Sequence, residues 1–223
     1  MATNPHHISC ASQRLHMVNG QLRTSDVRDP SVLAAFLEVP RERFVAPDRS
    51  GLAYLDQDQP AAGSKRRMLL APRTLALLLQ AASISPGERV LDVGGGSGYS
   101  AALLEKMGAS VVVVESDPGA LEAARELLAV RPDTEFVEGD LSAGAPGKGP
   151  YAAIIINGAF EISPTTLIDQ LAKSGRLVGI DARAGAKTAV IIDRAVAGFS
   201  ERALFEATAT VLDGFVRPPA FAF

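Results

Sequence analysis

A run of glycines directly after an apolar segment is the part of this sequence whose spacing could do chemistry. Residues 90–93 are Val-Leu-Asp-Val, and Gly94-Gly95-Gly96-Ser97-Gly98-Tyr99 follows. Glycines allow a tight turn and a close approach of the backbone to a ligand at the N-terminus of the next helix. The spacing is G-x-G-x-G, whereas the fingerprint of nicotinamide dinucleotides, G-x-G-x-x-G, needs a glycine at Tyr99. The pattern therefore argues against a dehydrogenase.

Three acidic residues complete the pattern. Asp92 lies within the first predicted strand, where a carboxylate can meet the ammonium group of an amino-acid ligand and would repel a pyrophosphate. Glu115 ends the second strand, where an acidic side chain accepts the hydroxyls of a ribose. Asp140 follows the third strand, where an adenine amine would lie. These carboxylates fit a ligand with an amine, a ribose and an adenine but no phosphate, as in S-adenosylmethionine.

We predict that the cofactor-binding residues are Asp92, Gly94, Gly95, Gly96, Gly98, Tyr99, Glu115, Ser116, Asp140, Leu141 and Asn157. The alternative is that the glycines only form a tight strand–helix turn and that the acidic residues are solvated strand ends. That alternative does not explain why all of them occur together. The histidines have no metal-ligand spacing with Cys10, so no metal site is expected.

The elements that must position these residues alternate between strand and helix after Pro86. Strands are predicted over 89–93, 110–115, 135–137, 152–156 and 176–180. Helices are predicted over 99–107, from Asp117-Pro118 onward, and from Ser163-Pro164 through Ala172. Segments 187–193 and 207–215 are predicted to close the sheet as an antiparallel pair. Before Pro86, helices are predicted over 13–22, from Pro30 through Leu37, and from Pro72.

This alternation predicts an α/β fold. We expect a doubly wound, mostly parallel seven-stranded class I methyltransferase (Rossmann-like) sheet with an N-terminal helical extension. Residues 1–85 are predicted to form the helical extension and a substrate-side loop, and residues 86–223 the cofactor-binding core.

The amino-acid composition limits the kinds of partner that we expect for this protein. The chain has 223 residues, 47% hydrophobic and 21% charged, which is ordinary for a globular protein. Its net charge of −3 gives no general attraction to nucleic acid or to an anionic membrane. The single cysteine and the absence of a long apolar run favour a cytoplasmic protein. We expect a monomer or a homodimer, with the apolar tail as a candidate dimer contact.

The chain resembles protein-L-isoaspartate O-methyltransferases over roughly residues 14 to 195. The resemblance begins at Met17-Val18-Asn19-Gly20-Gln21-Leu22-Arg23 and includes Val39-Pro40-Arg41-Glu42-Arg43-Phe44-Val45 and Ala53-Tyr54-Leu55-Asp56. It continues from Pro72, through residues 90–101 and through residues 171–178. The resemblance implies S-adenosylmethionine as cofactor and a protein or peptide carboxylate as acceptor, methylated in the repair of damaged aspartyl residues.

One segment departs from the family's pattern. The family has a Gly-Gln-Thr-Ile-Ser-type stretch before the proline that corresponds to Pro72, and its serine lies beside the methyl group and the substrate carboxylate. Here Leu70 stands at the serine position and Met68 at the threonine position. We therefore predict weak or absent activity on isoaspartyl peptides, and no catalytic residue is assigned. A methyltransferase of this fold with another acceptor, and an inactive cofactor-binding or interaction protein, remain alternatives.

Lys65, Arg66 and Arg67 form a cationic run just before this segment. The run is either a solvated loop or a clamp for an anionic substrate. We find no convincing general base in the sequence, which favours an acceptor that is ionised at neutral pH, such as a carboxylate.

Overall fold

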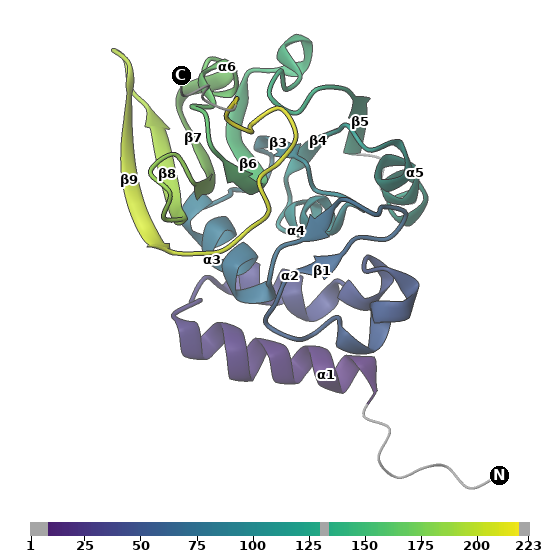
Figure 1. Cartoon of the computed structure of the whole chain (residues 1–223). Helices are drawn as coiled ribbons and strands as arrows, with labels where there is room; N and C mark the ends of the chain where they lie inside the picture. Colours follow the sequence, from purple (N-terminus) through teal and green to yellow (C-terminus); the bar gives the residue numbers. More distant parts are fainter. Residues whose placement is uncertain (1–8, 130–133, 219–223) are drawn as a thin grey trace, which may run out of the picture.

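The computed structural model describes residues 9–129 and 134–218, which form a central sheet with helices packed on it (Figure 1). The α-helices are α1 (Cys10–Met17), α2 (Pro30–Glu38), α3 (Pro72–Ala82), α4 (Tyr99–Lys106), α5 (Pro118–Leu127) and α6 (Thr165–Ile168). The main sheet contains β3 (Arg89–Val93), β4 (Ser110–Glu115), β5 (Thr134–Glu138), β6 (Tyr151–Phe160), β7 (Leu171–Asp181), β8 (Thr188–Arg194) and β9 (Phe199–Glu206). A separate two-stranded sheet pairs β1 (Gln59–Pro60) with β2 (Met68–Leu69).

The order of the main sheet is β5-β4-β3-β6-β7-β8-β9. Strands β3 to β7 pair in parallel, and β8 runs antiparallel to both of its neighbours. From β3 the chain adds β4 and β5 on one side, and it then returns to add β6 and β7 on the other side, so the strand order switches between β3 and β6. Ligands of open α/β sheets bind at such a switch point, outside the carboxyl ends of the strands. The predicted fold, a mostly parallel seven-stranded sheet with an N-terminal helical extension, is confirmed.

Each face of the sheet buries a different set of side chains. Val111 and Val113 of β4 join a core with α3, α4 and the N-terminal helices, and Val112 and Val114 join the core on the opposite face. That second face is covered by α6 and by two irregular segments, which contribute Leu141 and Leu212 to it. Because β4 is covered on both sides, its sequence is a continuous run of valines.

Two of the predicted N-terminal helix starts, Pro30 and Pro72, are confirmed, whereas the helix predicted over 13–22 begins earlier, at Cys10. The Asp29 carboxylate accepts from the backbone N–H groups of Ser31 and Val32, and Pro30 is the first residue of α2. After α1 the chain continues as a π-helical turn, Val18–Leu22. Pro72 likewise opens α3, which packs against β6 and β7. The division at residue 85 stays a prediction.

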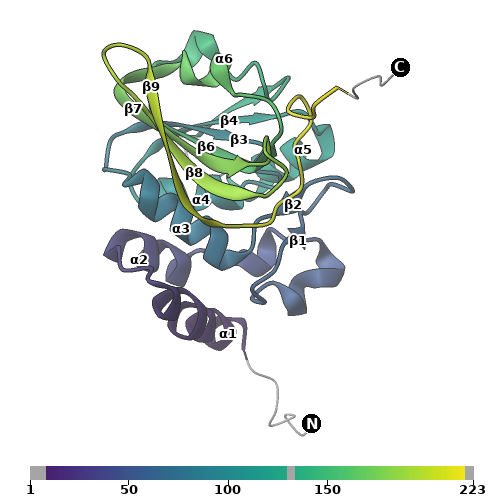
Figure 2. The same cartoon turned by 60° about the vertical axis from the view of Figure 1, so that its left-hand side comes forward.

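Two predicted elements are wrong. The helix predicted through Ala172 ends at Ile168, because Leu171 already belongs to β7, where it pairs with Tyr151. The predicted strand 207–215 is not the partner of β8. That partner is β9, a largely exposed edge strand, and the chain after β9 turns back across the sheet (Figure 2). There Val211 forms an isolated bridge with Ala159 of β6.

Candidate cofactor site

The turn between β3 and α4 requires glycine for backbone and packing reasons. Gly94, Gly96 and Gly98 have φ values of 67°, 62° and 90°. These lie in the left-handed region that glycine adopts without strain. At Gly95 an ideal Cβ would lie 2.3 Å from Oδ2 of Asp92, so any side chain there would collide with the carboxylate. The glycines thus bring the start of α4 directly onto Asp92.

Asp92 is fully buried beneath this turn. Its Oδ2 accepts a hydrogen bond from Oγ of Ser100 at 2.8 Å, and its Oδ1 accepts one from Nδ2 of Asn157 at 2.7 Å. Burial raises the pKa of Asp92 to about 6, although these two hydrogen bonds lower it. An ammonium group bound beside the carboxylate would oppose this effect of burial, because a nearby positive charge lowers the pKa of Asp92 and favours its ionised form.

Glu115 ends β4 next to the glycine turn and is also fully buried. Its Oε1 accepts hydrogen bonds from Nε of Arg67 at 2.7 Å and from the backbone N–H groups of Ser116 and Asp117 at 2.8 and 2.9 Å. Its Oε2 accepts from the backbone N–H of Gly96 at 3.1 Å. Both oxygens are therefore engaged by the chain itself.

The other predicted cofactor residues differ in how close they lie to Asp92 and to the glycine turn. Asn157 belongs to β6 and donates to Asp92, and Leu141 packs against Gly94. Asp140 is an exposed turn residue whose Oδ1 accepts from the backbone and hydroxyl of Ser142. The Tyr99 ring instead points into the N-terminal helices. Its ring centroid lies 6.0 Å from that of Phe36, 5.5 Å from that of Phe44 and 4.8 Å from the Arg41 guanidinium.

The cationic run divides into an exposed and a buried part. Lys65 and Arg66 are exposed, but the Arg67 side chain is only 4% exposed. Besides Glu115, its guanidinium reaches Oγ of Ser116 at 2.6 Å and Oδ2 of Asp213 at 3.2 Å, both from Nη2. No local pattern indicated this arrangement, because its acidic partners lie 48 and 146 residues further along the chain.

Leu70, at the position of the family's serine, is buried with 3% exposure. Its carbonyl accepts a hydrogen bond at 2.9 Å from Arg41, a fully buried arginine that also donates to the carbonyl of Ala53. A cavity of about 10 Å³ separates Leu70 from Gly95 and Asn157, which is the space of about one water molecule. This part of the site is small, and its lining combines the apolar side chains of Leu70 and Leu75 with the polar side chains of Ser100 and Asn157.

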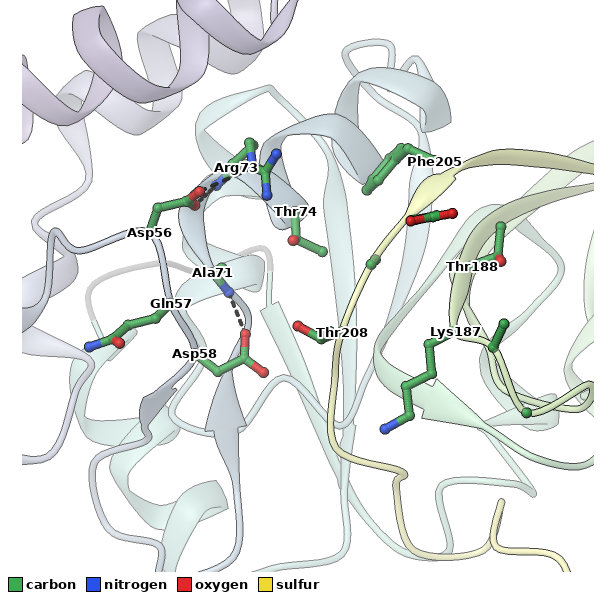
Figure 3. A pocket seen from close by; sticks show the side chains of 14 residues that line it. Asp56, Gln57, Asp58, Ala71, Arg73, Thr74, Lys187, Thr188, Phe205 and Thr208 are labelled. Atoms are coloured by element: carbon green, nitrogen blue, oxygen red, sulfur yellow. Dashed lines mark hydrogen bonds and ion pairs between the residues drawn. The ribbon is translucent and has the colours of Figure 1, made fainter.

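A larger pocket, of about 800 Å³, opens on the other side of Ala71 (Figure 3). It lies between the start of α3, the chain before β1, the beginning of β8 and the end of β9. The side chains of Asp58, Arg73 and Lys187 line it. Oδ1 of Asp58 accepts from the backbone N–H of Ala71 at 2.8 Å, and burial raises the pKa of Asp58. Asp58 is thus a candidate base that the sequence did not reveal.

Among the described residues, 9–129 and 134–218, no group of histidine, cysteine, aspartate and glutamate side chains could hold a metal ion. In the same part of the chain, none of the helices has the length and apolar character needed to cross a membrane.

The sheet, the glycine turn and the two buried carboxylates at adjacent strand ends define a class I methyltransferase. Comparison with known proteins shows which family of this class the chain belongs to. Residues 12–203 match the model of the protein-L-isoaspartate(D-aspartate) O-methyltransferase family. The chain belongs to this family, whose members are S-adenosylmethionine-dependent methyltransferases.

Individual relatives agree with this assignment. A protein-L-isoaspartate O-methyltransferase of Methanoculleus marisnigri is 40% identical over 171 residues, which are 76% of this chain and 77% of that protein. A solved protein-L-isoaspartate O-methyltransferase is similar with a TM-score of 0.78 at 25% identity, over 90% of this chain and 66% of that one. A beta-aspartate methyltransferase structure from Plasmodium falciparum, in complex with S-adenosyl-L-homocysteine, has the same fold, with a TM-score of 0.78 at 20% identity over 93% of this chain and 99% of that one.

The chemistry of the site suits the family's cofactor, but the glycine turn is closely packed in this structure. Asp92 and Glu115 supply the acceptors that an ammonium group and a ribose need. However, Cδ1 of Leu212 lies 2.9 Å from where a Cβ of Gly94 would be, and Ala61, Arg67 and Leu69 surround Gly96 at 3.0 to 3.5 Å from its Cβ position. In this structure Leu212 and Arg67 therefore pack against the glycine turn, and Oε1 of Glu115 is already bound by Arg67.

Proposed function

We propose that this chain methylates a carboxylate of a protein or peptide, which it holds in the pocket at the start of α3. The observation that carries this proposal is the pair of cationic side chains, Arg73 and Lys187, in a pocket of about 800 Å³ whose wall includes Ala71. The names of the relatives, protein-L-isoaspartate O-methyltransferases, support a protein acceptor.

The two cations differ in how free they are to bind an acceptor. Nε of Arg73 lies 3.0 Å from Oδ2 of Asp56, so its charge is already paired. Nζ of Lys187 donates to the carbonyl of Ala209 at 2.6 Å, and an ammonium group has three donors. Lys187 is therefore the side chain that would hold a carboxylate. An acceptor carboxylate is ionised at neutral pH and needs no base.

Isoaspartyl peptides are expected to be poor substrates of this pocket. Leu70 cannot donate the hydrogen bond that a hydroxyl at this position would supply. The Asp58 carboxylate, which accepts from the N–H of Ala71, is a like charge for any carboxylate acceptor in this pocket, so it does not discriminate between isoaspartyl and aspartyl residues.

Asp58 also supports a second candidate function, methyl transfer to a hydroxyl or an amine. Such acceptors need a general base, and burial raises the pKa of Asp58 toward the range in which a carboxylate accepts protons efficiently. Its position in the same pocket as Lys187 makes the two candidates separable by experiment.

The test measures transfer of labelled methyl groups to a panel of peptides that differ only in one isoaspartyl, aspartyl or seryl residue. We expect base-labile label, the mark of a methyl ester. Lys187→Ala should lower its incorporation about 10-fold or more, because a charge-assisted hydrogen bond contributes roughly 1.5–3 kcal/mol. Lys173→Ala, an exposed lysine of β7, is the control and should change nothing.

Asp58→Asn decides between the two candidates. If the acceptor is a carboxylate, removing the like charge leaves turnover unchanged or raises it. Base-stable label that disappears in Asp58→Asn would contradict the carboxylate proposal and establish Asp58 as the base for a hydroxyl or amine acceptor.

A further inference from the structure

The site that should receive the cofactor's ribose already holds a side chain of this chain. Glu115 stands at the end of the strand next to the glycine turn, where an acidic side chain accepts ribose hydroxyls. Here it is bound by the Arg67 guanidinium, with Nε of Arg67 2.7 Å from Oε1. Both residues are buried, at 4% and 0% side-chain exposure, so the ion pair is not a surface contact.

Two segments far apart in the sequence hold the guanidinium there. On the N-terminal side, Oγ of Ser64 accepts from the backbone N–H of Arg67 at 2.9 Å and donates to Oδ2 of Asp117 at 2.7 Å. On the C-terminal side, the carboxylate of Asp213 accepts from Nη2 of Arg67 at 3.2 Å. We call Arg67, Glu115 and Asp213 the latch.

Leu212, the residue before Asp213, packs against the glycine turn and against Gly158 of β6. Leu212 is 4% exposed, and its side chain fills the positions that a Cβ of Gly94 or of Gly158 would take, at 2.9 Å and 2.6 Å. Gly214 lies against Asp140, with its Cβ position 2.6 Å from Oδ1. The C-terminal segment thus packs against Gly94, Gly158 and Asp140 of the predicted cofactor site.

We propose that the latch is an autoinhibitory contact: Arg67 occupies the ribose position on Glu115, and S-adenosylmethionine binds only when Arg67 and the segment around Asp213 move away. The inference rests on Glu115 as the ribose acceptor, and it does not depend on which acceptor is methylated. The guanidinium competes with the ribose hydroxyls because it occupies Oε1 of the carboxylate that would accept them. Cofactor affinity is therefore set by the stability of the latch as well as by contacts with the cofactor.

The test is calorimetric titration with S-adenosyl-L-homocysteine, which binds without being consumed. We expect Arg67→Ala to bind at least 10-fold more tightly than the wild type, and Asp213→Ala, at a side chain that is 49% exposed, to bind a few-fold more tightly. Lys65→Ala is the control, because Lys65 is an exposed cation of the same run. A variant that was merely damaged would bind more weakly, so a gain in affinity separates the latch from a structural role.

Equal or weaker binding by a folded Arg67→Ala would overturn the proposal, and so would the absence of binding to every variant. If Arg67→Ala does not fold, hydrogen exchange of wild-type residues 64–70 replaces it. Faster exchange on adding the ligand supports displacement of Arg67, and unchanged or slower exchange overturns it. Failure of the proposed acceptor would appear in the methyl-transfer assay and leave these binding results unchanged.

Discussion

Replacing Asp92 by asparagine should stabilise the protein at neutral pH. Asp92 is fully buried, and its pKa is raised from 3.8 to about 6 by burial, with hydrogen bonds from Ser100 and Asn157 acting in the opposite direction. A shift of about two units corresponds to about 3 kcal/mol, at 1.36 kcal/mol per unit. In Asp92→Asn the new amide would keep the acceptor for Asn157, and the Ser100 hydroxyl can rotate to accept from its NH₂ group.

The sign of the pH dependence follows from the raised pKa. Between about pH 4 and pH 6 the folded state holds the Asp92 proton more tightly than the unfolded state, so stability falls as pH rises through this window. Above about pH 6 the loss is complete. Asp92→Asn should therefore be more stable than the wild type by about 3 kcal/mol at pH 7.5, with a difference that shrinks toward zero near pH 4.

Urea denaturation of the cofactor-free protein at a series of pH values measures this difference. Asp169→Asn is the matched control, since Asp169 is exposed, and it should follow the wild type throughout. A difference between Asp92→Asn and the wild type that is the same at pH 4.5 and pH 7.5, or an asparagine variant that is less stable at pH 7.5, would refute the reasoning.

Three further variants test other parts of the site. Glu115→Ala should weaken binding of S-adenosyl-L-homocysteine more than Glu122→Ala does, because Glu122 is exposed on α5; equal dissociation constants in calorimetry would remove Glu115 from the ribose site. Leu70→Ser should raise labelling of an isoaspartyl peptide by an order of magnitude or more, and robust wild-type labelling that the serine does not improve would show that the hydroxyl is dispensable. Gly98→Ala should cost about 1–2 kcal/mol in urea unfolding, since φ is 90° and its Cβ would lie 2.9 Å from Leu128; unchanged stability would show that the turn relaxes freely.

The sheet and its glycine turn could be predicted because their signals are local. The valine run of β4 and the helix starts at Asp29-Pro30 and Asp117-Pro118 each lie within a few residues of sequence. The carboxylates at the strand ends follow from the same reasoning, since parallel strands bring their carboxyl ends to one edge. Asp92 and Glu115 accordingly lie where the sequence predicted them.

The closing strand was mispredicted because hydrophobicity reports burial and not strand pairing. Leu212 and Phe215 are buried, which made residues 207–215 resemble a strand, but they are buried by crossing the sheet. The true edge strand, β9, is exposed over most of its length and carries only a weak apolar pattern. Its pairing with β8 depends on the hairpin that joins the two strands.

The latch could not be predicted from local pattern. A run such as Lys65-Arg66-Arg67 is typical of a solvated loop, and two of its three side chains are indeed exposed. The burial of Arg67 depends on two acidic partners that only the tertiary structure brings together. Asp58 could not be recognised as a candidate base for the same reason, since the chain brings it to the N–H of Ala71, 13 residues further along the sequence.

The most direct test of the account is a crystal structure of the protein with S-adenosyl-L-homocysteine. We predict that the ribose hydroxyls of the ligand bind Glu115 beside the glycine turn, with Arg67 withdrawn from this carboxylate and Leu212 displaced from Gly94. A ligand bound at this turn while Arg67 remains on Glu115, or a ligand bound elsewhere on the protein, would contradict the account.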